Sequence, residues 1–270
     1  MKTSIRYCFI FLGLMAHSLL SAEQYELKSD EVSQSHGAEA RVEAGVRFEP
    51  VHWFDIHIEE SARFSFDGTI KSYSKLQLNF PFSRYFGMGL EYAFIVKHSD
   101  EKNTQKHRVG GYAELTFHPG RWKISLKERP LLTMRFDSIN SAEKNKYDWK
   151  LRSKLAVQYN VPGKPVKPYI AFELENTLNA KAITGYVYDE QTATTTTYDF
   201  KGNYINKIRP EIGVKYTPRK RHHFNFFYKF DTSFDRSYNI THKSSKLEVT
   251  RSKSFTHIFG VTYTFDAGKK

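Results

Sequence analysis

The sequence predicts an all-β protein, an antiparallel up-and-down transmembrane β-barrel of about twelve strands, with 10–12 possible. Three observations support this: apolar and charged residues alternate with period two, short and long connections alternate, and aromatic residues gather near segment ends. Aromatic residues make up 16% of the 270 residues, which argues against a disordered chain. The repeated apolar runs of about twenty residues that a helical membrane protein needs are absent from the sequence.

Residues 1–22 have the layout of a secretory signal peptide, so we expect them to be removed on export. Lys2 and Arg6 give a basic start, Tyr7–Leu20 is apolar, and small residues follow at the cleavage position. An N-terminal membrane anchor is the alternative, but the apolar stretch is short for one. Cleavage would lower the formal net charge from +12 to +10, because Lys2 and Arg6 are lost without any acid. It would also remove Cys8, the only cysteine, and with it any disulfide or thiol chemistry.

Strict alternation predicts strands through most of the remaining chain. In 149–159, for example, Lys150, Arg152 and Lys154 alternate with apolar residues such as Leu151 and Leu155. The expected strands are 40–48, 53–64, 71–80, 85–94, 108–117, 121–136, 149–159, 167–175, 207–216, 222–231 and 254–265. Alternation alone does not separate a soluble sandwich from a membrane barrel, because both have one apolar and one polar face.

Connection lengths and aromatic positions favour the membrane barrel. The expected short connections are 81–84, 118–120, 160–166 and 217–221, and the expected long ones are 96–107, 137–148, 176–203 and 232–253. Short periplasmic turns and long extracellular loops are typical of outer-membrane barrels, and so are aromatic girdles at both membrane interfaces. Trp53, Trp122 and Trp149 all lie near the ends of expected strands. We therefore expect an integral outer-membrane protein of a Gram-negative-type envelope.

The number of strands follows from a parity argument. Single-chain bacterial barrels have an even number of strands, and the alternating segments number eleven. Gln24–Ser29 is the only candidate for a further, first strand, with 30–38 as its loop. Because this segment is short and charged, a tail that lies in the lumen is the alternative. The expected division is therefore an N-terminal segment 23–38, a barrel 39–265 and a short tail 266–270. The last strand ends at Phe265 and resembles the C-terminal signal that the barrel-assembly machinery recognises, so this machinery is an expected partner.

One face of the strands carries charged residues that a barrel would direct into its lumen. The predicted lumen-lining residues are Arg41, Glu43, Arg47, Arg63, Glu91, Arg108, Glu114, Lys150, Arg152, Lys154, Glu173, Glu175, Arg209, Glu211 and Lys215. Asp55, Glu59, Lys123, Lys127 and Lys229 fall on the same face. Such groups are either paired across strands in a filled interior or line a narrow water-filled pore. In a pore, the basic excess would favour anions.

The sequence favours a small channel or a structural barrel without catalysis, and no cofactor or metal motif is present. A barrel hydrolase acting on lipid or peptide is the first alternative. His98, Asp100 and His107 share one expected outer loop, although a solvated loop that contains two histidines is the simpler interpretation. The second alternative is a surface barrel that binds an extracellular ligand through its long loops, including Thr192–Thr197. The expected partners are outer-membrane lipid and glycolipid rather than nucleic acid. The sequence does not indicate an oligomeric state.

Several segments resemble a known family. Lys150–Pro162, followed by Lys167–Leu174, resembles the proteins that contain domain of unknown function 2490, which are predicted outer-membrane β-barrels. Arg41–Arg63, Gly87–Tyr92, His107–Glu114 and Ile208–Tyr216 fit the same pattern. The resemblance covers most of the chain after residue 22. It implies the barrel fold, and it implies no particular activity.

Overall fold

The computed structural model describes residues 23–98, 103–136, 146–180, 182–200, 202–241 and 245–269. The expected signal peptide 1–22 and Asp100 lie outside the described residues, as does the greater part of the expected loop 137–148. In the part of the chain that the structure describes, no helix combines the length and the apolar character needed to cross a membrane.

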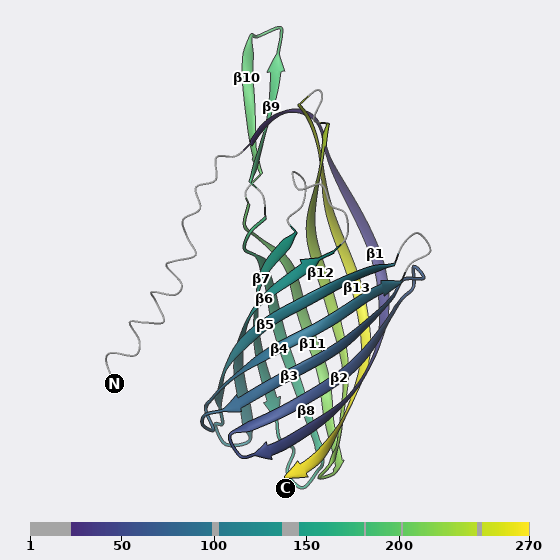
Figure 1. Cartoon of the computed structure of the whole chain (residues 1–270), viewed down its shortest axis with the longest axis vertical. Helices are drawn as coiled ribbons and strands as arrows, with labels where there is room; N and C mark the ends of the chain where they lie inside the picture. The colour runs from purple at the N-terminus through teal and green to yellow at the C-terminus, as the bar shows by residue number, and fades with distance from the viewer. Residues whose placement is uncertain are drawn as a thin grey trace, which may run out of the picture.

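The described residues form thirteen strands, and eleven of them close into a barrel (Figure 1). The barrel strands are β1 (Glu23–Val51), β2 (Phe54–Ser65), β3 (Ile70–Pro81), β4 (Phe86–His98), β5 (Thr104–Phe117), β6 (Trp122–Arg135), β7 (Tyr147–Tyr159), β8 (Val166–Thr177), β11 (Tyr204–Arg219), β12 (His222–Thr241) and β13 (Lys246–Lys269). The hairpin of β9 (Ile183–Asp189) and β10 (Thr194–Phe200) lies outside the barrel and pairs with β1. The predicted all-β barrel is confirmed, and each of the eleven alternating segments forms a barrel strand.

The barrel closes through a parallel pair. Neighbouring barrel strands are antiparallel except for β1 and β13, whose register runs in parallel from Glu26 opposite Lys246 to Glu49 opposite Lys269. An up-and-down barrel with an odd number of strands begins and ends with strands that run the same way, so its closing pair has to be parallel. In Figure 1, β1 and β13 therefore both run from the upper end of the barrel to the lower end.

The expectation of a separate twelfth strand at Gln24–Ser29 is wrong. β1 is continuous from Glu23 to Val51, so 30–38 is strand and not loop. The physical reason is backbone hydrogen bonding, which a strand needs for every amide along its length. β13 pairs with β1 from Glu26 onwards, and β9 pairs with its first residues. A polar stretch without alternation thus becomes a strand, and the barrel keeps an odd number of strands.

The two ends of the barrel differ in their connections. The lower end carries the short turns, such as those between Pro81 and Phe86 and between Phe117 and Trp122. The upper end carries the long connections, but two of these contain strands. Within 176–203 lies the β9–β10 hairpin, and within 232–253 β12 continues to Thr241 before β13 begins at Lys246. The short connections at the lower end were predicted correctly. At the upper end the prediction was only partly correct, because most of 232–253 is strand and residues 66–69 alone join β2 to β3.

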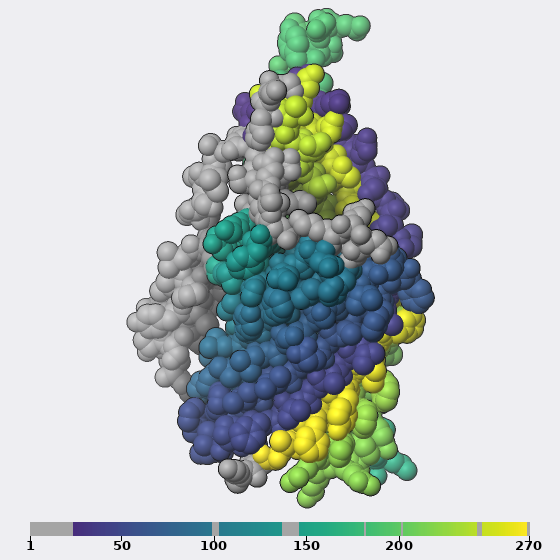
Figure 2. Space-filling model, turned by 45° about the vertical axis from the view of Figure 1, so that its right-hand side comes forward, coloured from purple at the N-terminus to yellow at the C-terminus, as the bar shows by residue number. Residues whose placement is uncertain are grey.

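The strands that continue past the barrel form a small structure of their own, which we call the extension. It consists of residues 23–38, the β9–β10 hairpin, residues 234–241 and residues 246–253. Figure 2 shows the green hairpin clear of the barrel at the upper end. The extension has a conventional apolar core made by Ile183, Phe200, Tyr238, Ile240, Leu247 and Val249, against which Tyr25 and Leu27 pack. Leu247 and Val249 are fully buried. On its surface, hydrogen bonds from Lys28 and Asn239 lower the pKa of the Glu248 carboxyl.

In the barrel itself the usual burial pattern is inverted. Outward apolar side chains are exposed, with Ile170 at 59% and Phe259 at 58% of full exposure. Inward carboxylates are buried, with Glu91 at 6% and Glu175 at 1%. A soluble sandwich buries its apolar face against a second sheet. The polar groups of this barrel occupy the interior instead, and its apolar groups form the outer surface.

Three inward aromatic rings each lie over a glycine of a neighbouring strand. The pairs are Tyr112 over Gly89, Tyr169 over Gly213 and Phe227 over Gly260. A Cβ atom on Gly260 would lie 2.1 Å from the Phe227 ring, which is far closer than van der Waals contact allows. The glycines therefore make room for aromatic rings that fill part of the lumen.

A charged lumen as the candidate functional site

The centre of the lumen is a polar cavity of about 230 Å³. Each of the eleven barrel strands contributes at least one side chain to its lining. Nine cations and five carboxylates line it, namely Arg41, Arg63, Lys75, Arg108, Arg129, Arg152, Lys154, Arg209 and Lys229 with Glu43, Glu59, Glu91, Glu173 and Glu211. Because one small cavity touches every strand, side chains occupy most of the interior around it.

Ten of the fifteen predicted lumen residues line this central cavity. They are Arg41, Glu43, Arg63, Glu91, Arg108, Arg152, Lys154, Glu173, Arg209 and Glu211. Arg47 and Glu114 line a second cavity towards the lower end. Lys150 and Glu175 form an ion pair with each other at 3.0 Å. The Lys215 ammonium lies 5.3 Å from the centre of the Tyr169 ring.

Glu175 is the most buried carboxylate of the network. Its oxygens accept hydrogen bonds from Lys150 and Asn206, each at 3.0 Å, and from Arg152. Arg209 lies 3.6 Å from the same carboxylate. A buried charge is expensive unless it is paired and hydrogen-bonded, and Glu175 satisfies both conditions.

Arg209 and Glu211 connect several strands. The Arg209 guanidinium donates to Glu173 at 2.5 Å and to Asp231 at 2.8 Å. Glu211 accepts hydrogen bonds from Lys154 at 2.7 Å and from the Tyr169 hydroxyl at 2.6 Å. Lys154 lies on β7 and Glu211 on β11, and β8 separates these strands. The bond therefore spans part of the lumen and does not link adjacent strands.

A second ion pair passes over an intervening strand. Arg129 on β6 donates to Glu91 on β4 at 2.6 and 2.7 Å, passing over β5. The β5 residue opposite Glu91 is Gly110, and a Cβ there would lie 2.6 Å from the Leu131 side chain and 3.4 Å from that of Glu91. The glycine thus leaves the space in which this pair forms.

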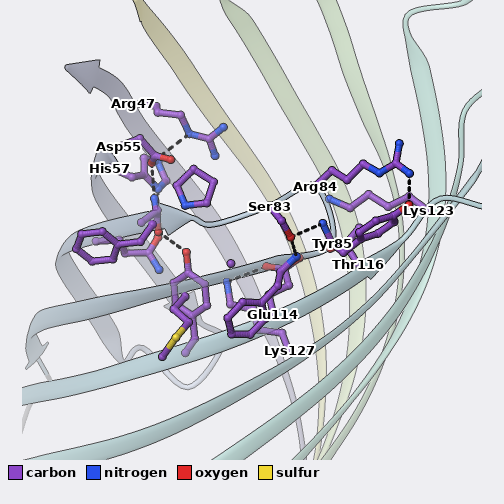
Figure 3. A pocket seen from close by; sticks show the side chains of 18 of the residues that line it. Arg47, Asp55, His57, Ser83, Arg84, Tyr85, Glu114, Thr116, Lys123 and Lys127 are labelled. Atoms are coloured by element: carbon purple, nitrogen blue, oxygen red, sulfur yellow. Dashed lines mark hydrogen bonds and ion pairs between the residues drawn. The ribbon is translucent and has the colours of Figure 1, made fainter. Parts of the chain in front are cut away.

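The lower cavity has a volume of about 390 Å³, and its lining includes residues of the β3–β4 turn (Figure 3). Asp55 accepts a hydrogen bond from Asn79 and lies 3.9 Å from Arg47. Lys127 lies 3.5 Å from Glu114 and 3.6 Å from the centre of the Tyr112 ring. This end of the lumen is polar as well, and its cations and acids are also in contact.

Two cations and one phenol of the central cavity were not predicted from the sequence, namely Lys75, Arg129 and Tyr73. Lys75 forms a 2.6 Å ion pair with Glu59, and Arg129 binds Glu91. The period-two pattern contained the signal for both residues. Lys75 occupies an inward-facing position of its strand, and Arg129 lies two residues after Lys127, so both are on the lumen face. The inward aromatic rings were missed because their positions depend on glycines of other strands.

Two of the three candidate catalytic residues, His98 and His107, lie in the part of the chain that the structure describes. The His107 ring shares a hydrogen bond of 2.7 Å with the Tyr92 hydroxyl and packs against Phe94 and Phe136. Asp100 lies outside the described residues, and the structure shows no contact between His98 and His107. Among the residues that the structure describes, no three His, Cys, Asp or Glu side chains are grouped so that they could hold a metal ion.

Comparison with known proteins agrees with the resemblance seen in the strand motifs. No match was found among curated proteins or among solved structures. One family model, described as protein of unknown function (DUF2490), matches residues 41–241. The match runs from the part of β1 that closes the barrel to the end of β12, so it covers most of the barrel. The chain therefore belongs to the DUF2490 family.

Proposed function

We propose that the chain is an integral outer-membrane β-barrel without catalytic activity, which acts as a small channel with a narrow, charged lumen. The inverted burial pattern carries this proposal. Outward residues such as Leu90, Leu155 and Phe226 are apolar and half exposed, while the inward carboxylates are buried. Exposed apolar surface of this extent is unfavourable in water and is expected of a barrel whose outer face contacts lipid.

Strand length and aromatic positions agree with insertion into a bilayer. β2 and β8 have 12 residues each, and a tilted strand needs only about ten residues to cross the hydrocarbon core. Exposed aromatic residues surround the lower end, namely Trp53, Phe82, Tyr85, Phe117, Trp122 and Tyr216. Tyr147 and Trp149 are exposed at the upper end of β7. In the proposed membrane barrel, these two bands would form the girdles at the two membrane interfaces.

The connections support one orientation. Short turns belong on the periplasmic side, so the lower end would face the periplasm and the extension would lie outside the cell. Export would depend on residues 1–22 as a cleaved signal peptide, and assembly on the last strand. Exposed Lys and Arg side chains near the upper rim would meet the phosphate groups of outer-leaflet glycolipid. The odd number of strands departs from the rule for single-chain bacterial barrels, but a mitochondrial channel also has an odd number.

The size and charge of the lumen support the proposal of a narrow passage for small anions. Barrels of about eight strands are filled by side chains, whereas those of sixteen or more leave an aqueous channel. This barrel of eleven lies between them, and its interior holds crossing ion pairs and a cavity of about 230 Å³. Since nine cations face five carboxylates around that cavity, the local field would concentrate anions.

Two measurements test the proposal. A folded outer-membrane barrel is expected to migrate differently on a semi-native gel before and after heating, and identical migration would contradict the barrel. In planar bilayers, the purified protein should show small conductance steps with a reversal potential that favours chloride over potassium. Large, non-selective steps would contradict the narrow lumen. Lipid hydrolysis without conductance would favour the hydrolase alternative.

A second candidate function is a surface barrel that binds an extracellular partner. The observation that favours it is the extension, whose apolar core holds the β9–β10 hairpin beyond the barrel. The hairpin tip carries the residues 192–197, and the described side chains there are exposed. Replacing residues 183–200 by a short linker separates the two functions, because the channel should keep its conductance while a binding protein should lose its partner.

A further inference from the structure

Four cations occupy neighbouring inward positions on four consecutive strands. Arg41 on β1 lies opposite Arg63 on β2, Arg63 lies opposite Lys71 on β3, and Lys71 lies opposite Lys97 on β4. Like charges directly opposite each other across strands destabilise a sheet. Such a row requires compensation by negative charge from some other source.

The nearby carboxylates that the structure describes form no ion pair with Arg63 or Arg108, and Glu43 accepts a hydrogen bond from the Thr262 hydroxyl at 2.7 Å. Glu39 is bound by Arg41 at 2.7 Å, Glu59 by Lys75 at 2.6 Å and Glu91 by Arg129 at 2.6 Å. Among the described residues, neither Arg63 nor Arg108 forms an ion pair. These acids therefore already have basic partners of their own.

Arg63 has a buried donor that a ligand in the cavity would satisfy, and Arg108 lines the same cavity. Arg63 stacks its guanidinium on the Tyr73 ring at 3.7 Å, and its buried Nε atom has no hydrogen-bond partner among the described residues. Arg108 donates from Nε to the Thr133 hydroxyl at 3.1 Å. Both side chains line the central cavity, and so does Arg152. Buried donors without partners are rare in folded proteins, so an unfilled donor beside a cavity points to a bound group.

We propose that the central cavity is a binding site for a small oxyanion of the phosphate class, held by Arg63 and Arg108. A guanidinium presents planar, paired donors that match the oxygens of phosphate, sulfate or carboxylate and bind them more strongly than a spherical halide. The volume of about 230 Å³ accommodates one such ion with a few waters. This site rests on the proposed function, because the ion can enter only if the lumen is open to solvent. It adds to that function the class of anion that the lumen binds.

The first test is binding of inorganic phosphate to the folded protein in detergent. We expect a saturable heat of binding with one site per chain, and a melting temperature that rises with phosphate concentration. Chloride at the same ionic strength should produce neither effect. Absence of saturable binding, or equal responses to phosphate and chloride, would overturn the site. Heat-modifiable migration of the same sample shows independently whether the barrel is folded. A sample that migrates as a folded barrel but does not bind phosphate would therefore contradict the binding site and not the proposed membrane barrel.

The second test locates the ion. Arg63→Gln and Arg108→Gln should each weaken phosphate binding at least tenfold, and Arg63→Lys should weaken it less because it keeps the charge but loses the paired donors. Arg121→Gln, at the exposed β5–β6 turn, is the matched control and should bind like the wild type. Unchanged binding by both glutamine variants would overturn the assignment.

Stability without phosphate separates a ligand-binding arginine from a structural one. Arg63→Gln removes a positive charge that faces Arg41 and Lys71, so in phosphate-free buffer it should melt at or above the wild-type temperature. A clearly lower melting temperature would indicate a structural role and contradict the proposal. If one glutamine variant does not fold, the other variant and the comparison of phosphate with chloride still decide the question.

Discussion

Lys154 donates a 2.7 Å hydrogen bond to Glu211 across β8, although its register partner on β8 is Glu173. Glu173 instead accepts from Arg209 at 2.5 Å. The ion pairs of the lumen thus follow its three-dimensional shape and not simply the register of adjacent strands. Interactions of this kind fix the distance between strands that share no backbone hydrogen bonds.

Removing the Glu211 carboxylate should destabilise the barrel markedly. Glu211→Gln would leave Lys154 and Lys229 in the lumen without the carboxylate that now lies 2.7 and 3.4 Å from them. Breaking a buried pair from one side leaves an uncompensated charge, and we expect a loss of about 3 kcal/mol of unfolding free energy. Urea unfolding in lipid vesicles measures this as a lower midpoint.

The matched control for that variant is Glu248→Gln. Glu248 forms a 2.9 Å ion pair with Lys28 on the surface of the extension, where water screens both charges. The unfolding midpoint should therefore stay near that of the wild type. A midpoint for Glu211→Gln as high as that of this control would mean that the lumen is wide and well hydrated.

The outer face of β7 gives a test of insertion into lipid. Leu155 points outward and is 47% exposed, so it would contact the hydrocarbon core of the proposed membrane barrel. Leu155→Arg should then cost about 2–4 kcal/mol near the middle of the bilayer. The measurement is the free energy of folding into vesicles, with Lys154→Arg as a control that keeps both the charge and the inward position. Equal, small effects would indicate that this face meets water.

The sequence predicted the faces of the strands far better than the contacts within the lumen. Alternation assigned Leu90 outward and Glu91 inward, because period two follows directly from strand geometry. It did not predict that Glu91 would bind Arg129, since that bond depends on the space above Gly110 of the intervening strand. The extension could not be predicted from alternation either. Its strands exist because β1, β9 and β13 satisfy one another's backbone groups around an apolar core.

Packing of aromatic rings against glycines should be sensitive to a single methyl group. Gly260→Ala places a Cβ atom 2.1 Å from the Phe227 ring, and we expect a cost of about 1–3 kcal/mol from overpacking. Gly37→Ala is the matched control, because its nearest neighbour, the Thr256 hydroxyl, is 4.0 Å away. Combining Gly260→Ala with Phe227→Ala should cost less than the sum of the two single changes. Strict additivity of the two would contradict the contact.

Disulfide cross-linking tests the parallel pairing of β1 with β13 that closes the barrel. Val42 and Val261 are register partners across this closure. In a chain with Cys8→Ser, Val42→Cys and Val261→Cys should form a disulfide on mild oxidation, because facing residues of adjacent strands lie within the distance that a disulfide spans. The readout is a faster band on a denaturing gel that disappears on reduction.

Shifting one cysteine by two residues provides the control for the closure. Val42→Cys with Phe259→Cys keeps both side chains on the outer face but adds about 7 Å along the strand, which exceeds the reach of a disulfide. This pair should oxidise slowly and incompletely. In a barrel of twelve strands, a separate strand at Gln24–Ser29 would lie between β1 and β13, and neither pair would form a disulfide. Rapid oxidation of the Val42 and Val261 pair alone is therefore the outcome expected of eleven strands with a parallel seam.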